Sequence, residues 1–243
     1  MIRRLFQILL FFIGFVTGGR LFADDLPVII ASPESCRHYL LLFGGQADKN
    51  RPQTAHTWAT FVKAVPQKTG TVLLEAFTIS WLPIQMPVRP LQLIPEAGRN
   101  YGLQETLSFF NTGKQKVSFW GPFQIREAWY NEALQHKQYL DSGAVRFNTL
   151  DRGPLIPRTL TLHPEISHCV HAFTRTNVSL QRASNPVIWY GEFITRNLAR
   201  RMREVGLLIQ PHVTHDWLIA PMGVDQYPLE RRSIDEPLIK FLR

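Results

Sequence analysis

The chain has 243 residues, of which 45% are hydrophobic and 19% are charged. This composition excludes a largely disordered chain and supplies enough apolar material for a packed core. The formal net charge is +8, but the basic residues are scattered and form no nucleic-acid-binding motif, so we expect no nucleic acid partner.

The first 23 residues have the pattern of an export signal. Met1–Arg4 is positively charged, Leu5–Val16 is an apolar run, and small residues lead to a cleavage site after Ala23. The run is shorter than the ~20 apolar residues that a membrane-spanning helix needs. We therefore predict cleavage, a single mature domain at 24–243, and export to the periplasm or the cell exterior. An uncleaved signal that anchors the chain to a membrane is the alternative.

The first half of the mature chain is predicted to be mostly β-structure. Tyr39–Gly45 is an apolar run that ends in glycines, which is typical of a strand. Thr54–Val65 and Thr71–Leu82 are rich in β-branched and aromatic residues, and Pro66–Gly70 between them has turn chemistry. These segments predict a long hairpin. Four prolines predict an irregular connection over 83–104.

Helices are predicted mainly in the second half. Gln104–Asn111 is a candidate short helix, and Phe123–Leu140 has apolar residues at helical spacing before a Gly-containing stop. Ser167 is predicted to cap a helix running to Thr174, and Tyr190–Val205 is predicted to be a longer helix. Residues 117–122 are an apolar run that breaks at Gly121-Pro122. Short strands are expected at 144–150 and 159–162, and the charged tail after Tyr227 is expected to fray or to drape over the surface. The fold class is thus α+β, with an antiparallel sheet of about five strands packed by helices.

Cys169 is the candidate nucleophile. It lies between His168 and His171, and a Ser167 cap would place it at the second position of a helix. Unpaired N–H groups and the helix dipole stabilise a thiolate there, which lowers the thiol pKa and prepares attack on an acyl carbon. His56, at the start of a predicted strand, is the first candidate for the base. The alternative is that Cys169 is a small buried apolar residue.

The chain has two cysteines, so a disulfide has to be weighed against thiol chemistry. Cys36 lies near the start of the mature chain and Cys169 far along it. In an exported protein these residues could form a bridge, which would remove the thiol as a nucleophile. Two cysteines do not make a disulfide framework, so the core must come from ordinary packing.

Two segments resemble a known family. Ala55–Val62 is similar to the histidine strand of the lecithin-retinol-acyltransferase-like proteins, and His168–Phe173 resembles their cysteine helix. These proteins belong to the permuted papain-like clan of peptidases, amidases and acyltransferases, in which the histidine strand comes before the cysteine helix, as it does here. The resemblance implies a permuted papain-like fold and an amide or ester substrate, such as a cell-envelope peptide or lipid. It also implies Cys169 as nucleophile and His56 as base.

The residue that would orient the base departs from the family pattern. The family often has a second histidine on the neighbouring strand, but residues 66–82 contain none. Four polar residues are candidates for this role: Thr78, Ser80, Asp216 and His171. His168 and Val170 stand where the family has Asn and Glu. Trp120–Phe123 and Thr214–Trp217 also resemble segments of exported bacterial proteins of unassigned function.

A histidine-rich set gives a second hypothesis, a divalent metal site. Its members are the potential zinc ligands His56, His168, Cys169, His171, His212, His215 and Asp216. No complete metal-binding signature is present in the sequence, so we expect neither a resident metal nor a cofactor. A third hypothesis is a non-catalytic envelope protein that kept a papain-like scaffold for binding or structural use.

A basic cluster lies on the predicted helix at 190–205. It consists of Arg196, Arg200, Arg201 and Arg203. A solvated helix face is the plain interpretation. Contact with anionic phospholipid headgroups is the functional alternative, and it would make the protein a peripheral membrane protein.

Overall fold

The computed structural model describes residues 35–47, 55–89, 92, 94–149, 165–181 and 191–237. The predicted export signal and the predicted strand at 159–162 lie outside these residues. The described part is a mixed α+β structure, as the sequence predicted. Within it, no helix combines the length and the apolar character needed to cross a membrane.

The main sheet has six strands, and five of them are joined by antiparallel pairing, whereas the sixth, β10, pairs in parallel. Its strands are β1 (Arg37–Gln46), β2 (His56–Pro66), β3 (Val72–Ile79), β6 (Lys116–Ile125), β9 (Leu208–Ile209) and β10 (Glu230–Arg232). The order is β10-β6-β1-β2-β3, and β9 also pairs with β6. The predicted strand at 39–45 and the predicted long hairpin are confirmed as β1, β2 and β3.

A second, smaller sheet has four short strands. They are β4 (Trp81–Pro83), β5 (Glu96–Asn100), β7 (Val145–Phe147) and β8 (Glu165–Ser167), in the order β4-β5-β7-β8. Strand β5 lies inside the region that its prolines predicted to be irregular, because the segment after Pro95 carries no proline and pairs with β4 and β7. Strand β8 was not predicted, and it matters for the cysteine helix that follows it.

Five α-helices are described. They are α1 (Leu103–Thr112), α2 (Glu127–Asp141), α3 (Cys169–Thr174), α4 (Val178–Gln181) and α5 (Gly191–Glu204). Short 3-10 turns η2 (Asp216–Leu218) and η3 (Val224–Gln226) follow α5. The prediction that α2 begins at Phe123 was wrong. Residues up to Ile125 extend β6 through pairing with β1, where Ile125 lies opposite His38.

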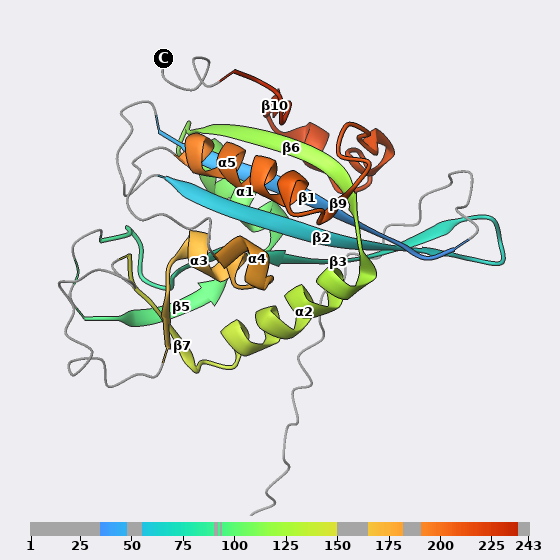
Figure 1. The fold of residues 1–243 in the computed structure, drawn as a ribbon. Helices are drawn as coiled ribbons and strands as arrows, with labels where there is room; N and C mark the ends of the chain where they lie inside the picture. Colours follow the sequence, from blue (N-terminus) through green and yellow to red (C-terminus); the bar gives the residue numbers. More distant parts are fainter. Residues whose placement is uncertain are drawn as a thin grey trace, which may run out of the picture.

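The main sheet is buried on both faces, and each face has its own core cluster. Helices α2, α3 and α5 cover one face, called here the α5 face, where Leu40, Ala59 and Phe61 are buried. Helix α1 and turn η2 cover the other, called here the α1 face, where Phe43 and Trp58 are buried. Figure 1 shows α5 on the near side of the sheet and α1 on the far side.

Two glycines in β1 let these helices approach the sheet closely. A Cβ at Gly44 would lie 2.6 Å from Thr195 Oγ1 of α5, and a Cβ at Gly45 would lie 2.1 Å from the Phe110 ring of α1. Successive side chains of a strand point to opposite faces. Gly44 therefore faces α5 and Gly45 faces α1, and the other residues of β1 alternate between the two faces from these positions.

Candidate functional site

Cys169 is the first residue of α3, and its side chain is half-buried. The helix packs on the α5 face through Val170, Ala172 and Phe173, and Cys169 packs against the same cluster. The predicted cap was wrong by one residue. His168 is the N-cap, and its Nδ1 accepts hydrogen bonds from the N–H groups of Val170 at 3.1 Å and His171 at 3.4 Å.

Tertiary contacts explain why Ser167 does not cap the helix. Ser167 is fully buried at the end of β8, where it pairs with Phe147 of β7. Its carbonyl oxygen accepts a hydrogen bond from Trp81 Nε1 at 3.1 Å. These bonds hold Ser167 in the sheet, so the extended residue before the helix is His168, with φ −101° and ψ 176°.

The His168 cap changes the chemistry expected at Cys169. A neutral imidazole accepts at one nitrogen and donates at the other, so the proton of His168 is assigned to Nε2. The N–H groups of Val170 and His171 were expected to stabilise a thiolate or an oxyanion. They are already donated to His168, so they offer less to the sulfur of Cys169.

We expect His168→Ala to lower the free energy of unfolding by about 1 kcal/mol, because two N–H groups of α3 lose their acceptor. His168→Asn should retain most of this stability, since an asparagine side chain also caps helices well. Urea unfolding of both variants near neutral pH measures the difference. Equal losses in the two variants would mean that the ring, which stacks on His171 at 4.0 Å, matters for its packing and not for its hydrogen bonds.

His56 is the first residue of β2 and is 2% exposed. Its ring lies on the α1 face, stacked on Trp58 and Phe110 with centroid distances of 5.2 Å and 6.0 Å. Its Nε2 lies 2.8 Å from Ser80 Oγ. Burial lowers the pKa of His56 to about 3, so the ring is neutral at any pH near 7.

A buried chain of hydroxyl groups continues from His56. The Thr106 hydroxyl lies 3.0 Å from Ser80 Oγ and donates to the carbonyl oxygen of Gly102 at 2.8 Å. His56 Nδ1 has no hydrogen-bond partner among the described residues. Because a buried unpaired N–H is rarer than a buried unpaired acceptor, we place the imidazole proton on Nε2, which donates to Ser80. Ser80 Oγ therefore accepts a hydrogen bond from His56 and fixes the orientation of its ring. In this arrangement His56 does not take a proton from Ser80.

His56 and Cys169 lie on opposite faces of the main sheet. The residue of β2 that projects to the α5 face at this end is Thr57, whose Oγ1 lies 2.9 Å from Thr195 Oγ1 of α5. Cys169 packs on that face, whereas His56 contacts Trp58 and Phe110 on the other. Side chains on opposite faces of a sheet are separated by its backbone. The nucleophile–base pairing expected from the sequence is therefore not formed between these two residues.

The other candidate orienting residues are dispersed. Thr78 Oγ1 lies 2.9 Å from Thr60 Oγ1 in a buried cross-strand pair. Asp216 is exposed in η2 and binds the Arg231 guanidinium with both carboxylate oxygens. That hydrogen bonding holds the pKa of the Asp216 carboxyl below its usual range. His171 is buried in α3. Only Ser80 contacts His56 among the four.

The candidate metal ligands are also dispersed. His168, Cys169 and His171 lie on or next to α3, on the α5 face, while His215 packs edge-on against Tyr39, a residue of the α1 face. His212 Nδ1 lies 3.5 Å from Asp235. In the ranges that the structure describes, no three His, Cys, Asp or Glu residues gather as a metal site would need. No disulfide joins Cys36, which is exposed before β1, to Cys169.

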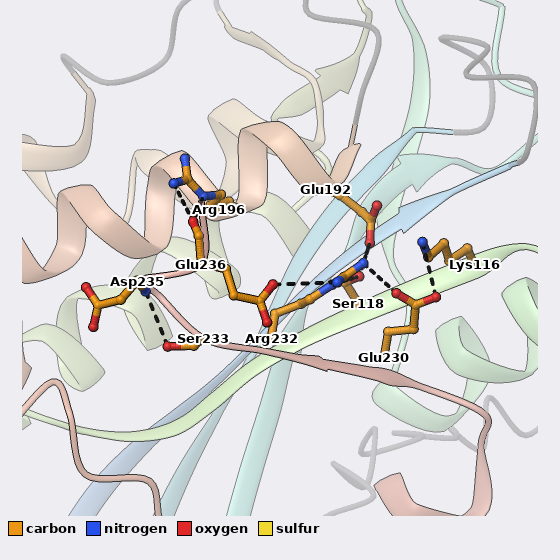
Figure 2. Close-up of polar contacts among 9 residues, drawn as sticks. All are labelled: Lys116, Ser118, Glu192, Arg196, Glu230, Arg232, Ser233, Asp235 and Glu236. Atoms are coloured by element: carbon orange, nitrogen blue, oxygen red, sulfur yellow. Dashed lines mark hydrogen bonds and ion pairs between the residues drawn. The ribbon is translucent and has the colours of Figure 1, made fainter. Parts of the chain in front are cut away.

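Two of the four arginines expected to form a basic face on α5 contact the C-terminal segment, and Figure 2 shows one of them, Arg196. Arg196 is buried, and its Nε and Nη2 donate to the carbonyl oxygen of Glu236 at 2.9 Å and 2.6 Å. Arg203 pairs with Asp235, and Arg201 lies 3.6 Å from Glu204. Arg196 and Arg203 are therefore held by the C-terminal segment, whereas Arg200 is exposed on α5.

The same segment contains a residue that the sequence did not single out, Arg232. This residue of β10 reaches across β6 to α5, where its guanidinium lies 3.3 Å from Glu192 and 3.2 Å from Ser118 Oγ. It also pairs with Glu230 and lies 3.5 Å from Glu236 (Figure 2). The prediction that the tail drapes loosely was wrong here, because these contacts and three parallel pairings with β6 hold it.

Together the fold and the site define a mixed α+β protein with a half-buried cysteine at a helix start and a fully buried histidine on the far face of the sheet. Comparisons of this chain with protein-family models, with curated proteins and with solved structures found no match.

Proposed function

We propose that this chain is a non-catalytic binding or structural protein of the cell envelope, built on a permuted papain-like scaffold. One observation carries the proposal: His56 and Cys169 lie on opposite faces of the main sheet, and His56 is enclosed by Trp58, Phe110 and Ser80. A general base must come within hydrogen-bond reach of the proton that it takes. A ring held in this position packs the core and does not serve the thiol.

The scaffold part of the proposal rests on element order and packing. A strand that opens with a histidine, β2, precedes a helix that opens with a cysteine, α3. This order is the one that the resemblance implies, and α3 packs against β2 through Phe173 and Phe61. The envelope location rests on the export-signal pattern of the first 23 residues.

The proposal predicts that the reactivity of Cys169 does not depend on His56. Alkylation of Cys169 by iodoacetamide should rise with pH as the thiolate forms, and His56→Gln should leave the rate unchanged at every pH. Peptide-resolved mass spectrometry from about pH 5 to about pH 9 separates Cys169 from Cys36, and Cys169→Ser is the blank. Circular dichroism confirms that each variant is folded. Rapid labelling at acid pH that disappears in His56→Gln would refute the proposal.

A second candidate function is a thiol hydrolase or acyltransferase in which His171, not His56, is the base. Cys169 remains partly accessible, and His171 lies two residues further along the same helix. In this scheme the thiol proton passes to His171, the thiolate attacks an ester or amide carbonyl, and the leaving alcohol or amine takes the proton. Water or an acceptor then cleaves the thioester. Side chains two residues apart on a helix do not face each other, which makes this candidate weaker. Ester hydrolysis that is lost in Cys169→Ser and His171→Gln but kept in His56→Gln would select it.

A further inference from the structure

The two edges of the main sheet differ in how they are closed. Along β6, β9 pairs with the last two residues, β10 pairs with residues 118–120, and between them the His215 N–H donates to the carbonyl oxygen of Pro122 at 2.9 Å. Strand β3 forms the other edge, at the end of the sheet away from β6 and β10 (Figure 1). Among the described residues β3 pairs with β2 alone, so the outer side of its backbone carries unpaired N–H and C=O groups.

Strand β3 has none of the sequence features that keep an open edge from pairing. Residues 72–79 contain no proline, glycine or lysine. Glu75 is the only charged residue of the strand, and its carboxylate lies 3.2 Å from the Lys63 amine of β2. Leu73 and Phe77 are half-buried, so apolar surface lies beside the unpaired backbone. An added strand would satisfy the backbone and cover this surface at the same time.

The chain enters the main sheet close to this edge. Arg37, the first residue of β1, lies opposite Ala64 of β2, which in turn lies opposite Leu74 of β3. Because strands are about 4.8 Å apart, a strand added beyond β3 would lie about 14 Å from the start of β1. Burial is the main cause that raises the pKa of the Cys36 thiol, and the Glu75 carboxylate of β3 adds a smaller increase. The residue just before β1 is therefore within electrostatic reach of β3.

The N-terminal segment, residues 24–34, lies outside the described residues and has the length and composition to fill this place. An extended chain covers about 3.3 Å per residue, so residues 32–36 span the distance from β1. Residues 26–31 then cover about 20 Å, which is most of the length of β3. They carry no charge, and Val28–Ile30 is β-branched throughout. Pro27 is tolerated because the new strand would itself be an edge strand.

We propose that residues 26–31 add a strand to the main sheet, antiparallel to β3, and close its open edge. The direction follows from the path of the chain, because the segment must run toward the start of β1 and β3 runs away from it. A second copy of the chain is a poorer occupant, since it competes with a tethered segment whose effective concentration is on the order of millimolar. The added strand shields the sheet from pairing with other chains, whether or not Cys169 reacts.

Disulfide trapping in the full chain tests the pairing. In a Cys36→Ser/Cys169→Ser background, Leu73→Cys is combined in turn with a cysteine substitution at each of residues 28–30. At least one combination should oxidise to an intramolecular bridge, because facing residues of neighbouring strands have Cβ atoms about 5 Å apart. In the matched controls Val178→Cys, at an exposed position of α4, replaces Leu73→Cys and should stay reduced. Equal bridging in the two series overturns the proposal. So does a dimer bridged through Leu73→Cys alone, because the occupant would then be a second copy.

Hydrogen exchange of the full chain supplies a second measurement. Val28→Gly/Ile29→Gly/Ile30→Gly removes the β-branched side chains of the segment and lowers its β-propensity. Amides on the outer side of β3 should then exchange at least about tenfold faster than in the wild type. Amides of β10, at the opposite edge, should exchange equally in the two proteins, which separates this effect from a loss of overall stability. Unchanged exchange along β3 overturns the proposal.

Discussion

His56→Phe is expected to flatten the acid side of the stability–pH curve. Burial lowers the pKa of His56 to about 3 in the folded protein, whereas an unfolded histidine has a pKa of about 6.5. Below about pH 6.5 the unfolded chain therefore binds a proton that the folded chain excludes. The stabilisation is present in full above that pH and is lost as the pH falls toward 3. The slope from this residue is about 1.4 kcal/mol per pH unit, and the total is on the order of 5 kcal/mol.

Phenylalanine keeps the ring between Trp58 and Phe110 but cannot titrate. Near pH 7 the variant should be less stable by about 1–2 kcal/mol, because Ser80 loses a buried hydrogen bond. As the pH falls the wild type loses stability faster, so the two curves should meet near about pH 5. Urea unfolding followed by circular dichroism across this range measures both curves.

Ser80→Ala is the matched control for His56→Phe. It removes the same hydrogen bond while leaving the buried imidazole in place. The steep acid slope should therefore persist in Ser80→Ala, since burial and not Ser80 lowers the pKa of His56. Identical pH slopes in His56→Phe and Ser80→Ala would contradict the assignment of the slope to His56.

The sequence predicted the strand that carries His56 but not the direction in which His56 projects. Alternation along β2 puts Trp58 and Val62 on one face and Ala59 and Phe61 on the other. Both sets are apolar and both faces are buried, so the pattern contains nothing that tells which face receives the cysteine helix. Which face receives the cysteine helix depends on where α1 and α3 pack, and both helices come later in the chain. The position of the site therefore depended on contacts that local sequence does not encode.

The cap of α3 and the C-terminal strand also depend on tertiary contacts that local sequence does not encode. Helix-capping preferences favour serine over histidine, and they would hold if Ser167 were free. Its pairing with Phe147 and its bond to Trp81 override the local preference. Strand β10 has only three residues and is fixed by contacts of Arg232 with β6 and α5. A charged tail with such distant partners carries no periodic signal from which to predict a strand.

Arg232→Met is expected to lower the free energy of unfolding by about 3 kcal/mol. The Arg232 and Glu192 side chains are only 12% and 10% exposed, and the Glu236 side chain is 18% exposed. Methionine fills similar space but leaves these carboxylates largely buried without their cation. Removing one member of a buried ion pair costs more than the pair contributes, because the remaining charge has been taken out of water.

The neighbouring arginine offers a matched control within β10. Arg231 pairs with Asp216, and the two side chains are 43% and 54% exposed. Arg231→Met should therefore cost less than about 1 kcal/mol, since exposed ion pairs contribute little. Urea unfolding near pH 7 compares the two variants directly. The double variant Arg232→Met/Glu192→Met should recover part of the loss, because it also removes the stranded charge. If Arg232→Met costs no more than Arg231→Met, the network in Figure 2 does not hold the C-terminal strand, and the parallel pairing with β6 is sufficient.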